Sequence, residues 1–318
     1  RPAVLGFEPE VESMLAVADN QRVTEPFWDG YWNFLWNREI APVNIPLNAD
    51  YDESRIREYL HMEIAPRYDK PSTSPKPLPG STQFSAGDTG TKLDYDRATL
   101  QIIDALGSST NRSVNLALDK SAVPRPSMAD LEIMMKQIID VSGFDGIAEI
   151  YLKDFGTNRN LSFAYQNGTD ELQPGIAFSA WSTVKIPLMV TAFRYLDEPW
   201  PEEYLILMEE MIEQSENTST DELARKVIDS NLAPMIVTDD LQRLGLNNTF
   251  WGGYFYFGAP LLQRYETPAN QRQDINTDPD IYVQTAPSDL GILMEDIYRC
   301  AEQGGGALIA AFPGEITQ

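Results

Sequence analysis

The sequence of 318 residues has one cysteine and one histidine, and each shortage excludes a class of site. A single cysteine, Cys300, cannot form a disulfide within the chain or build a cysteine-rich zinc or iron–sulfur site. A single histidine, His61, leaves no histidine cluster for a catalytic metal and argues against a Ser-His-Asp triad. We therefore expect neither a metal nor a cofactor in the chemistry of this chain.

Long apolar runs and positive charge are also scarce. The sequence contains no run of the ~18–20 apolar residues that a membrane span needs. The chain carries 24 Lys and Arg against 48 Asp and Glu, a formal net charge of −24. Binding to nucleic acid requires a basic surface, so this charge argues against nucleic acid as a partner. Most of the acidity lies after residue 125, where we interpret it as a solvated, solubilising surface.

The chain begins with Arg1 rather than with methionine. We expect that a signal or anchor segment was removed or omitted before this residue, as in an exported protein. The predicted location is therefore extracellular or attached to a bacterial cell envelope.

The prolines on either side of Arg125 mark the predicted domain boundary. Pro124 and Pro126 fix φ, and the residue before each proline is pushed toward extended geometry. A length of 318 residues suits two domains of about 100–200 residues each. We predict a first domain over residues 1–125 and a second over residues 126–318.

The first half contains signals for helices and for strands. Five prolines between residues 66 and 91 predict a loop or a long hairpin connection. The apolar spacing and the alternating patterns around this loop predict a small α+β domain. The expected helices cover residues 53–64 and 95–106, and the expected strands cover 43–47 and 114–118.

The run from Phe27 to Trp36 is dense in aromatic residues. Such rings can bind a sugar or a peptide, but in a small domain they more often form the packing core. We interpret the run as core and keep ligand binding as the alternative.

The first half resembles small domains that are described as peptidoglycan-binding in exported proteins of the bacterial envelope. The similarity covers roughly residues 20–125. It depends on the aromatic run before Arg38, the strand and helix over Asn44–Leu60, and the turn from Gly90 to Asp94 that enters a helix. None of these features is a chemical motif, so the resemblance implies an envelope module without proving that it binds glycan.

The second half begins with a predicted helix and a β-hairpin. Apolar residues between Leu131 and Ile139 recur at helical spacing after Ser127. Residues 147–152 and 161–166 are typical of two strands joined by a turn. Further helices are expected to begin near residue 182 and to cover 202–214, 219–230 and 287–300.

A serine and a lysine stand three residues apart at the start of one of these helices. Ser182 and Lys185 would project from one helix face, within reach of each other. A serine hydroxyl is a weak nucleophile until a base takes its proton, and lysine can be that base when burial leaves it partly neutral. The helix N-terminus would also favour an oxyanion that develops beside Ser182. The pair alone is a weak signal, because an ordinary capped helix would account for it.

Two further motifs follow in order. Ser215-Glu216-Asn217 lies between two predicted helices, and Arg264-Tyr265-Glu266 is followed by Asn270. Together with the serine–lysine pair, they make the second half similar to the penicillin-recognising serine hydrolases, closest to the class A β-lactamases. Those enzymes carry S-x-x-K, S-D-N, an Ω-loop with R-x-E-x-x-x-N, and K-T-G in that order. The resemblance implies an α+β fold of the β-lactamase/D,D-peptidase type, in which helices flank an antiparallel sheet.

The resemblance assigns the acylation step to four residues. Ser182 would attack the carbonyl group and become acylated, with Lys185 as the proton acceptor. Ser215 would relay a proton to the leaving nitrogen. Asn217 would hold Lys185 and the substrate amide by hydrogen bonds.

The resemblance assigns release of the acyl group to two later residues. Glu266 would activate the water that attacks the acyl group, and Asn270 would orient that water. Two positions depart from the family pattern: Glu216 replaces the usual aspartate, and Thr267 separates Glu266 from the following proline. These departures weaken the assignment of Glu266 more than that of Ser182.

The largest departure is an absent motif. No lysine follows Lys226, so the sequence has no K-T-G or K-S-G after Glu266. The family completes its sheet with three strands after the Ω-loop, and a two-stranded hairpin alone is marginal in water. We expect the remaining strands to belong to a segment outside this sequence, through truncation, proteolysis or assignment to a separate chain. The alternative is a degenerate, inactive relative.

The predicted function is hydrolysis of amide or ester bonds through an acyl-Ser182 intermediate. The partner would be a small-molecule substrate such as a β-lactam or small ester, or a D-alanyl peptide derived from peptidoglycan. The alternative function is that of a non-catalytic envelope-binding protein that kept the fold and lost turnover.

Overall fold

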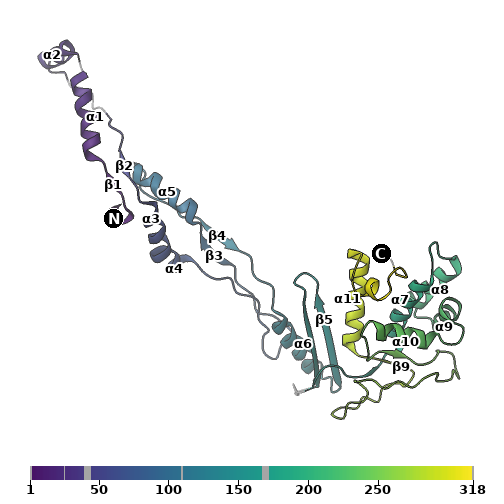
Figure 1. Ribbon diagram of the computed structural model, residues 1–318. Helices are drawn as coiled ribbons and strands as arrows, with labels where there is room; N and C mark the ends of the chain where they lie inside the picture. Colours follow the sequence, from purple (N-terminus) through teal and green to yellow (C-terminus); the bar gives the residue numbers. More distant parts are fainter. Residues whose placement is uncertain (1, 25, 39–43, 109, 167–171, 317–318) are drawn as a thin grey trace. The chain divides into compact units, whose positions relative to one another are not determined.

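The computed structural model divides the chain into two compact units (Figure 1). Unit 1 comprises residues 1–76 and 84–127, and unit 2 comprises residues 77–83 and 128–318. The sequence patterns did not indicate that the short segment 77–83 packs with the second unit. The structure describes residues 2–24, 26–38, 44–108, 110–166 and 172–316.

Unit 1 is built from short helices and from pairs of antiparallel strands. Strand β1 pairs with β2, and β3 pairs with β4. The elements in chain order are η1 (Pro2–Leu5), β1 (Glu8–Pro9), α1 (Val11–Thr24), α2 (Phe27–Leu35), β2 (Ala49–Asp50), α3 (Glu53–Tyr59), the π-helical turn η2 (Leu60–Ile64), α4 (Ala65–Tyr68), β3 (Gly90–Leu93), α5 (Tyr95–Gly107) and β4 (Leu118–Ser121).

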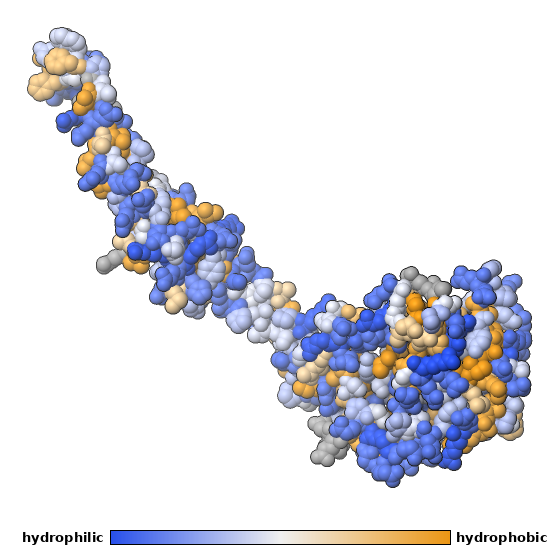
Figure 2. Space-filling view, in the orientation of Figure 1, coloured by the Kyte–Doolittle hydropathy of each residue, from blue (hydrophilic) through white to orange (hydrophobic). Residues whose placement is uncertain are grey.

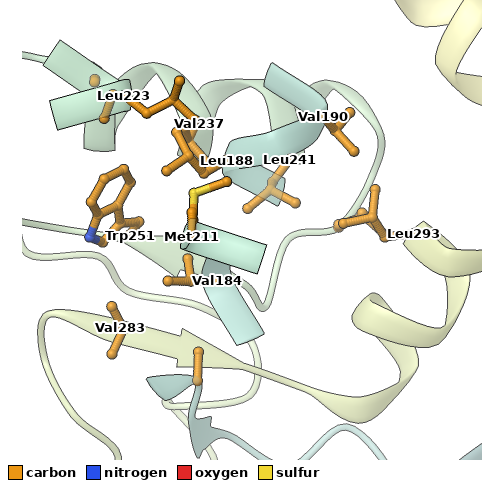
Figure 3. Close-up of a cluster of buried hydrophobic side chains, with 14 of the residues drawn as sticks. Val184, Leu188, Val190, Met211, Leu223, Val237, Leu241, Trp251, Val283 and Leu293 are labelled. Atoms are coloured by element: carbon orange, nitrogen blue, oxygen red, sulfur yellow. The ribbon is translucent and has the colours of Figure 1, made fainter. Parts of the chain in front are cut away.

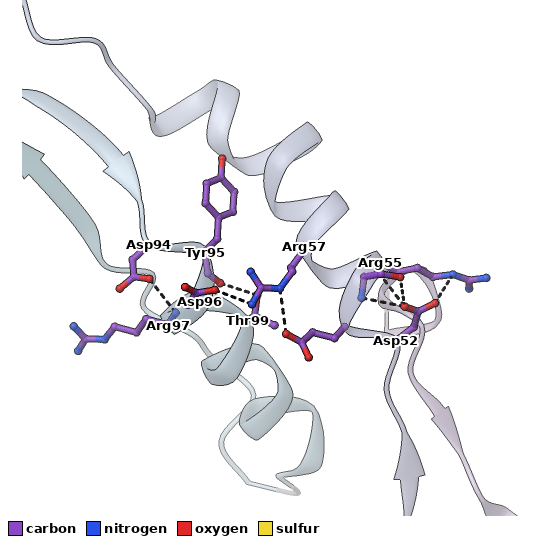
Figure 4. Close-up of polar contacts among 10 residues, drawn as sticks. Asp52, Arg55, Arg57, Asp94, Tyr95, Asp96, Arg97 and Thr99 are labelled. Carbon is purple, nitrogen blue, oxygen red and sulfur yellow. Dashed lines mark hydrogen bonds and ion pairs between the residues drawn. The ribbon is translucent and has the colours of Figure 1, made fainter.

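Helices α3 and α5 each start at an aspartate whose carboxylate accepts from free backbone N–H groups. Asp52 accepts from the backbone of Ser54 and Arg55 at the start of α3, and Asp94 accepts from Arg97 N at the start of α5 (Figure 4). Arg57 then joins the two helices, with 2.7 Å between its Nη2 and Asp96 Oδ1. Between these helices lies a small core of Ile56, Leu60, Leu93 and Ala98.

Several predictions for unit 1 need correction. The helix expected over 53–64 continues through η2 and α4 to Tyr68, so the loop expected from residue 66 starts three residues later. Pro66 is tolerated because it occupies the first turn of α4, where its missing N–H is not needed. The strand expected at 114–118 is instead Leu118–Ser121, where pairing with β3 sets its position. Residues 44–47 form no strand, and Val43 lies outside the described residues.

The aromatic run of α2 is not part of a core, contrary to the first interpretation. Its seven large apolar side chains from Phe27 to Trp36 are 43–85% exposed, and no residue of α2 is buried. The rings contact one another, as in the stacked pair Phe27 and Tyr31. Figure 2 shows orange and pale surface at the end of unit 1 that carries α2 in Figure 1. The side chains of this run are aromatic, but among the described residues no neighbouring helix or strand covers them to form a core.

Unit 2 combines a helical part with small antiparallel sheets. Its elements in chain order are α6 (Met128–Ser142), β5 (Ile147–Asp154), β6 (Arg159–Gln166), β7 (Phe178–Ser179), the 3₁₀ turn η3 (Trp181–Val184), α7 (Lys185–Tyr195), α8 (Glu202–Glu213), α9 (Asn217–Leu223), the π-helical turn η4 (Ala224–Ile228), α10 (Ala233–Arg243), β8 (Phe250–Trp251), β9 (Val283–Thr285), α11 (Pro287–Gln303) and α12 (Ala307–Ala311).

The hairpin β5–β6 is paired along its whole length, from Ile147 opposite Gln166 to Asp154 opposite Arg159. Apolar residues of β6 pack on α6, and α11 packs against β5. The approach of α11 requires Gly291, because a Cβ there would lie 2.1 Å from a ring carbon of Tyr151. Among the described residues no third strand joins this hairpin, and the other sheet of unit 2 has the short strands in the order β7-β9-β8.

The main core of unit 2 surrounds α7 (Figure 3). Leu188 of α7, Met211 of α8 and Trp251 of β8 are fully buried there. The far end of α7 is fixed by Arg194, which donates to the carboxylates of Asp240 and Glu315. Helix α7, which begins at Lys185, is therefore packed in the main core and held by ion pairs at its far end. No described helix has both the length and the apolar content that a bilayer crossing requires.

Candidate active site

Ser182 lies on a short turn between a strand and a helix. The backbone N–H of Ala180 donates to Val283 O of β9, which ties the start of this turn to the sheet. Trp181 then adopts a positive φ of 49°, an uncommon conformation for a residue other than glycine. Val184 is buried below, whereas Ser182 is exposed. The turn therefore presents the Ser182 hydroxyl at the surface, one residue beyond a conformation that costs free energy.

Lys185 is the first residue of α7, and its side chain is almost completely buried, with 2% exposure. Its Nζ lies 3.1 Å from Ser215 Oγ and 2.9 Å from Asn217 Oδ1. It also donates to the backbone carbonyl of Ser215. On another side, Nζ lies 5.5 Å from the ring centre of Phe255. The structure thus brings together three of the residues that the motifs single out.

Burial lowers the pKa of Lys185 below its ordinary value of 10.5, because the charged ammonium loses hydration. The carboxylates of Glu216 and Asp221 oppose this shift, since negative charge favours the ammonium form. Burial is the larger effect. The amine is therefore closer to its neutral form than an exposed lysine would be, as a proton acceptor requires.

The loop between α8 and α9 positions the partners of Lys185. Glu216 N donates to Glu210 O, which turns the chain back at the end of α8. Ser215 has a positive φ of 59°, and this left-handed residue aims both its carbonyl and its hydroxyl oxygen at the amine. Asn217 opens α9 and reaches the same nitrogen.

The structure does not join every predicted residue to this group. Among the described residues, no hydrogen bond links the Ser182 hydroxyl to Lys185. Glu266 is exposed, and in the described part of the chain it makes no hydrogen bond or ion pair with Ser182, Lys185 or Ser215. It lines a separate pocket of about 170 Å³ together with Arg264 and neighbouring residues of the same loop.

Asn270 is engaged in holding its own loop. Its Oδ1 accepts from Thr267 N at 2.9 Å, and its Nδ2 donates to Tyr265 O at 3.1 Å. The same Nδ2 donates to Oε1 of the fully buried Gln284 in β9 at 2.9 Å. These bonds make Asn270 a structural residue of the 264–270 loop in this arrangement.

A pocket of about 420 Å³ adjoins the lysine group, and sequence reasoning missed most of it. Its walls come from α9 and from the aromatic segment after β8. Arg225 lies over the rings of Tyr254 and Tyr256, at 4.6 and 4.8 Å from their centres. The lining residues are Asn217, Thr218, Asp221, Glu222, Arg225, Phe255, Tyr256 and Phe257.

Asp221 is the group that fixes this segment. It is 4% exposed, and its carboxylate accepts from Phe255 N at 2.9 Å and from Tyr256 N at 2.8 Å. Burial raises the pKa of Asp221, and the two backbone N–H groups oppose that rise by stabilising the charged form. Nothing in the local sequence distinguishes this aspartate from the other acidic residues, so only the fold reveals it.

Comparisons with known proteins find one distant structural similarity at the chosen threshold. No family model matches the chain, and no curated protein matches it. Among solved structures, the β-lactamase from Desulfarculus baarsii DSM 2075 is similar at a TM-score of 0.38 and 16% sequence identity. The match covers 60% of this chain and 66% of that one, just under two thirds of its length. A TM-score this low does not establish a shared fold, and no match supports the peptidoglycan-binding resemblance of the first half.

Proposed function

We propose that unit 2 catalyses acyl transfer from amide or ester substrates, with Ser182 as the nucleophile. The observation that carries the proposal is the environment of Lys185. A lysine that is 2% exposed, has a lowered pKa and donates hydrogen bonds to two motif residues is equipped to be a base. It lies one helical turn after an exposed serine.

In the proposed acylation, the neutral amine keeps two N–H groups as donors to Ser215 O and Asn217 Oδ1. Its lone pair is then left for a hydroxyl donor. The Ser182 hydroxyl gives its proton to Nζ while Oγ bonds to the substrate carbonyl carbon. The carbon–nitrogen or carbon–oxygen bond of the substrate then breaks, and Ser215 passes its proton to the leaving atom while it takes the proton held on Nζ, which becomes neutral again. Asn217 also binds the substrate amide.

The remaining roles follow the resemblance and belong to the proposal. Glu266 and Asn270 would serve release of the acyl group by water. The substrate would be a β-lactam, a D-alanyl peptide from peptidoglycan or a small ester. A β-lactamase-like fold completed by a further or separate segment, an extracellular or envelope-attached location, and an envelope role for unit 1 complete the proposal.

Acylation is tested with a fluorescent penicillin and the full chain. Intact-mass measurement is expected to find one adduct per chain, and peptide mapping is expected to place it on Ser182. The Ser182→Ala variant should carry no adduct, whereas Thr183→Ala, which changes a neighbouring hydroxyl, should still be labelled. An adduct that persists in Ser182→Ala contradicts the proposal, as does the absence of any adduct with acylating probes.

One observation favours the non-catalytic alternative. The serine hydroxyl and the lysine amine share no hydrogen bond among the described residues, although catalytic hydrogen bonds are often long before substrate binds. A binding protein would retain the pocket beside Asn217 and hold a peptide or β-lactam without a covalent bond. Reversible binding that survives in Ser182→Ala, with no mass change, would establish this alternative.

A further inference from the structure

We propose that helix α2 attaches the protein to the surface of a lipid bilayer whose headgroups carry no net charge. Its aromatic side chains enter the interfacial layer, where headgroups meet acyl chains, and the helix does not cross the membrane. The inference concerns unit 1 and does not depend on the acyl transfer proposed for unit 2. It begins with the run from Phe27 to Trp36, whose exposure in the structure has no role in that chemistry.

The large side chains of α2 lie on one side of the helix. Successive residues of an α-helix are rotated by about 100°, so residues three and four positions apart share a side. Six large side chains fall within an arc of about 160°, and the polar residues Asp29 and Asn33 fall outside it. We call these six side chains the aromatic face: Phe27, Trp28, Tyr31, Trp32, Phe34 and Leu35.

The aromatic face is uncovered in the part of the chain that the structure describes. Its side chains are 43–85% exposed, and no residue of α2 is buried. Its rings contact one another, as do Tyr31 and Trp32 with 5.5 Å between their centres. Because a whole aromatic side chain has about 150–250 Å² to bury, the face exposes on the order of 700 Å². The largest apolar patch on a typical soluble monomer is smaller, at roughly 300–600 Å².

The charge and the polar groups of this segment match a neutral bilayer interface. Asp29 is the only charged residue from Phe27 to Trp36, and it lies outside the aromatic face. The chain carries a net charge of −24, so anionic headgroups would repel it. Tryptophan and tyrosine combine an apolar ring with one polar group, and they are enriched where a membrane meets water. A helix of this kind lies in the plane of the interface, with its apolar face about 5–10 Å deep.

Two other occupants fit the aromatic face less well. A helix of nine residues is about 14 Å long, so a second copy packed along it would cover only the side turned toward that copy. That contact falls well short of the ~800 Å² per partner of a standard stable interface. A sugar needs a concave site with convergent polar groups, whereas the polar side chains of α2 lie away from the face. A bilayer interface deforms around the whole arc and covers all six side chains at once.

Flotation with phosphatidylcholine vesicles tests the proposal on the full chain. The protein and the vesicles are centrifuged under a density gradient, and the ratio of floating to free protein is measured. We expect most of the protein to float at about 1 mM lipid. The variant Trp28→Ser/Tyr31→Ser/Leu35→Ser removes the middle of the aromatic face and should lower this ratio at least about tenfold.

Matched variants separate the aromatic face from exposed apolar surface in general. Met62→Ser/Tyr68→Ser/Leu100→Ser changes three side chains of unit 1 that are 53–69% exposed on other helices, and it should float within about twofold of the original chain. Asn33→Ser changes the polar side of α2 and should behave in the same way. The face residues are not buried, so their triple variant should keep its circular dichroism spectrum. If it unfolds, Trp28→Ser alone replaces it, with an expected loss of about threefold.

Vesicles of a second composition test the assignment to neutral headgroups. When phosphatidylglycerol replaces half of the phosphatidylcholine, the floating fraction should fall at low ionic strength. Added salt should restore it, because salt screens the repulsion between the anionic lipid and the acidic chain. Stronger flotation with the anionic lipid would overturn the assignment.

The remaining outcomes decide which occupant covers the aromatic face. No flotation of the original chain overturns the proposal, as does equal flotation of the triple variant. Self-association that the triple variant abolishes, without flotation, would assign the face to a second copy instead. Co-sedimentation with insoluble peptidoglycan that the same variant abolishes, again without flotation, would assign it to glycan. None of these results bears on a Ser182 adduct, so the proposed function is decided separately.

Discussion

The amine of Lys185 and the carboxylate of Glu266 are the two ionisable groups that the proposed chemistry would use, and their surroundings differ. Lys185 is buried under α9 and hydrogen-bonded to two neighbouring residues, whereas Glu266 is exposed on a loop that Asn270 holds. A buried charge must be satisfied by fixed partners, and those partners determine where it lies. An exposed carboxylate is satisfied by water, so nothing needs to hold it near the serine.

The largest effect is expected from Lys185→Met, which keeps the length of the side chain and removes the amine. Acylation of Ser182 should fall about 10²–10⁴-fold, as for loss of a general base. The measurement is the rate of adduct formation with fluorescent penicillin. Lys226→Met is the matched control, because that lysine is exposed and pairs with Glu203 and Glu222; it should be labelled at the original rate. A Lys185→Met rate within tenfold of the original would contradict the role of the amine.

Alanine variants of the two asparagines test this difference, because one variant should slow acylation and the other should lower stability. Asn217→Ala removes a partner of Lys185 and should slow acylation about 10–100-fold with little change in unfolding. Asn270→Ala removes the bonds to Thr267, Tyr265 and Gln284 and should lower the free energy of unfolding by about 1–3 kcal/mol. Its acylation rate should stay within about threefold. Slow acylation in Asn270→Ala together with unchanged acylation in Asn217→Ala would instead place the catalytic residues in the 264–270 loop.

Asp296 extends the comparison to a buried carboxyl group that is less well satisfied than Lys185. Its side chain is 7% exposed, and its Oδ2 has no hydrogen bond among the described residues. Burial, with repulsion from Glu295, raises its pKa from 3.8 to about 6. The protonated carboxyl therefore adds stability that is fully present below pH 3.8 and is lost as the pH rises through about 6.

Asp296→Asn should consequently stabilise unit 2 at pH 8 by about 1–3 kcal/mol and have less effect at pH 4. Denaturant unfolding at the two pH values measures the difference. An equal effect at both pH values would show that the carboxylate is solvated or paired in solution.

The smallest expected effect is a displaced pH profile. Burial lowers the pKa of Lys185, so the acylation rate should rise with pH and reach half of its plateau below pH 10.5. Glu266→Gln should leave this midpoint in place. A midpoint at or above 10.5 would indicate that the amine is hydrated when it acts.

Local signals in the sequence predicted the elements that local physics determines. The helices at 95–106 and 287–300 have apolar spacing and polar starts, and the hairpin from residue 147 has a turn between two alternating strands; all three are present. The mixed α+β class with small antiparallel sheets also agrees with the prediction. The finer assignment to a β-lactamase-like fold and the catalytic roles stay predictions.

Features set by distant contacts could not be predicted. The position of β4 follows from pairing with β3, and the packing of residues 77–83 with unit 2 has no local signal. Asp221 and Phe255 are 34 residues apart, so no spacing rule connects them. The run Phe27–Trp36 has the composition of a core, and only the absence of covering elements in the described structure shows that it is not one.

The distribution of indole rings has an optical consequence. Trp28, Trp32, Trp36 and Trp181 are 46–76% exposed, whereas Trp251 is fully buried. Intrinsic emission will therefore be dominated by water-exposed rings, two of them on α2 and one directly after it, with a wavelength near that of an unfolded chain. Trp181 is adjacent to Ser182, so replacing Trp28, Trp32 and Trp36 by phenylalanine would leave an exposed spectroscopic reporter beside that serine.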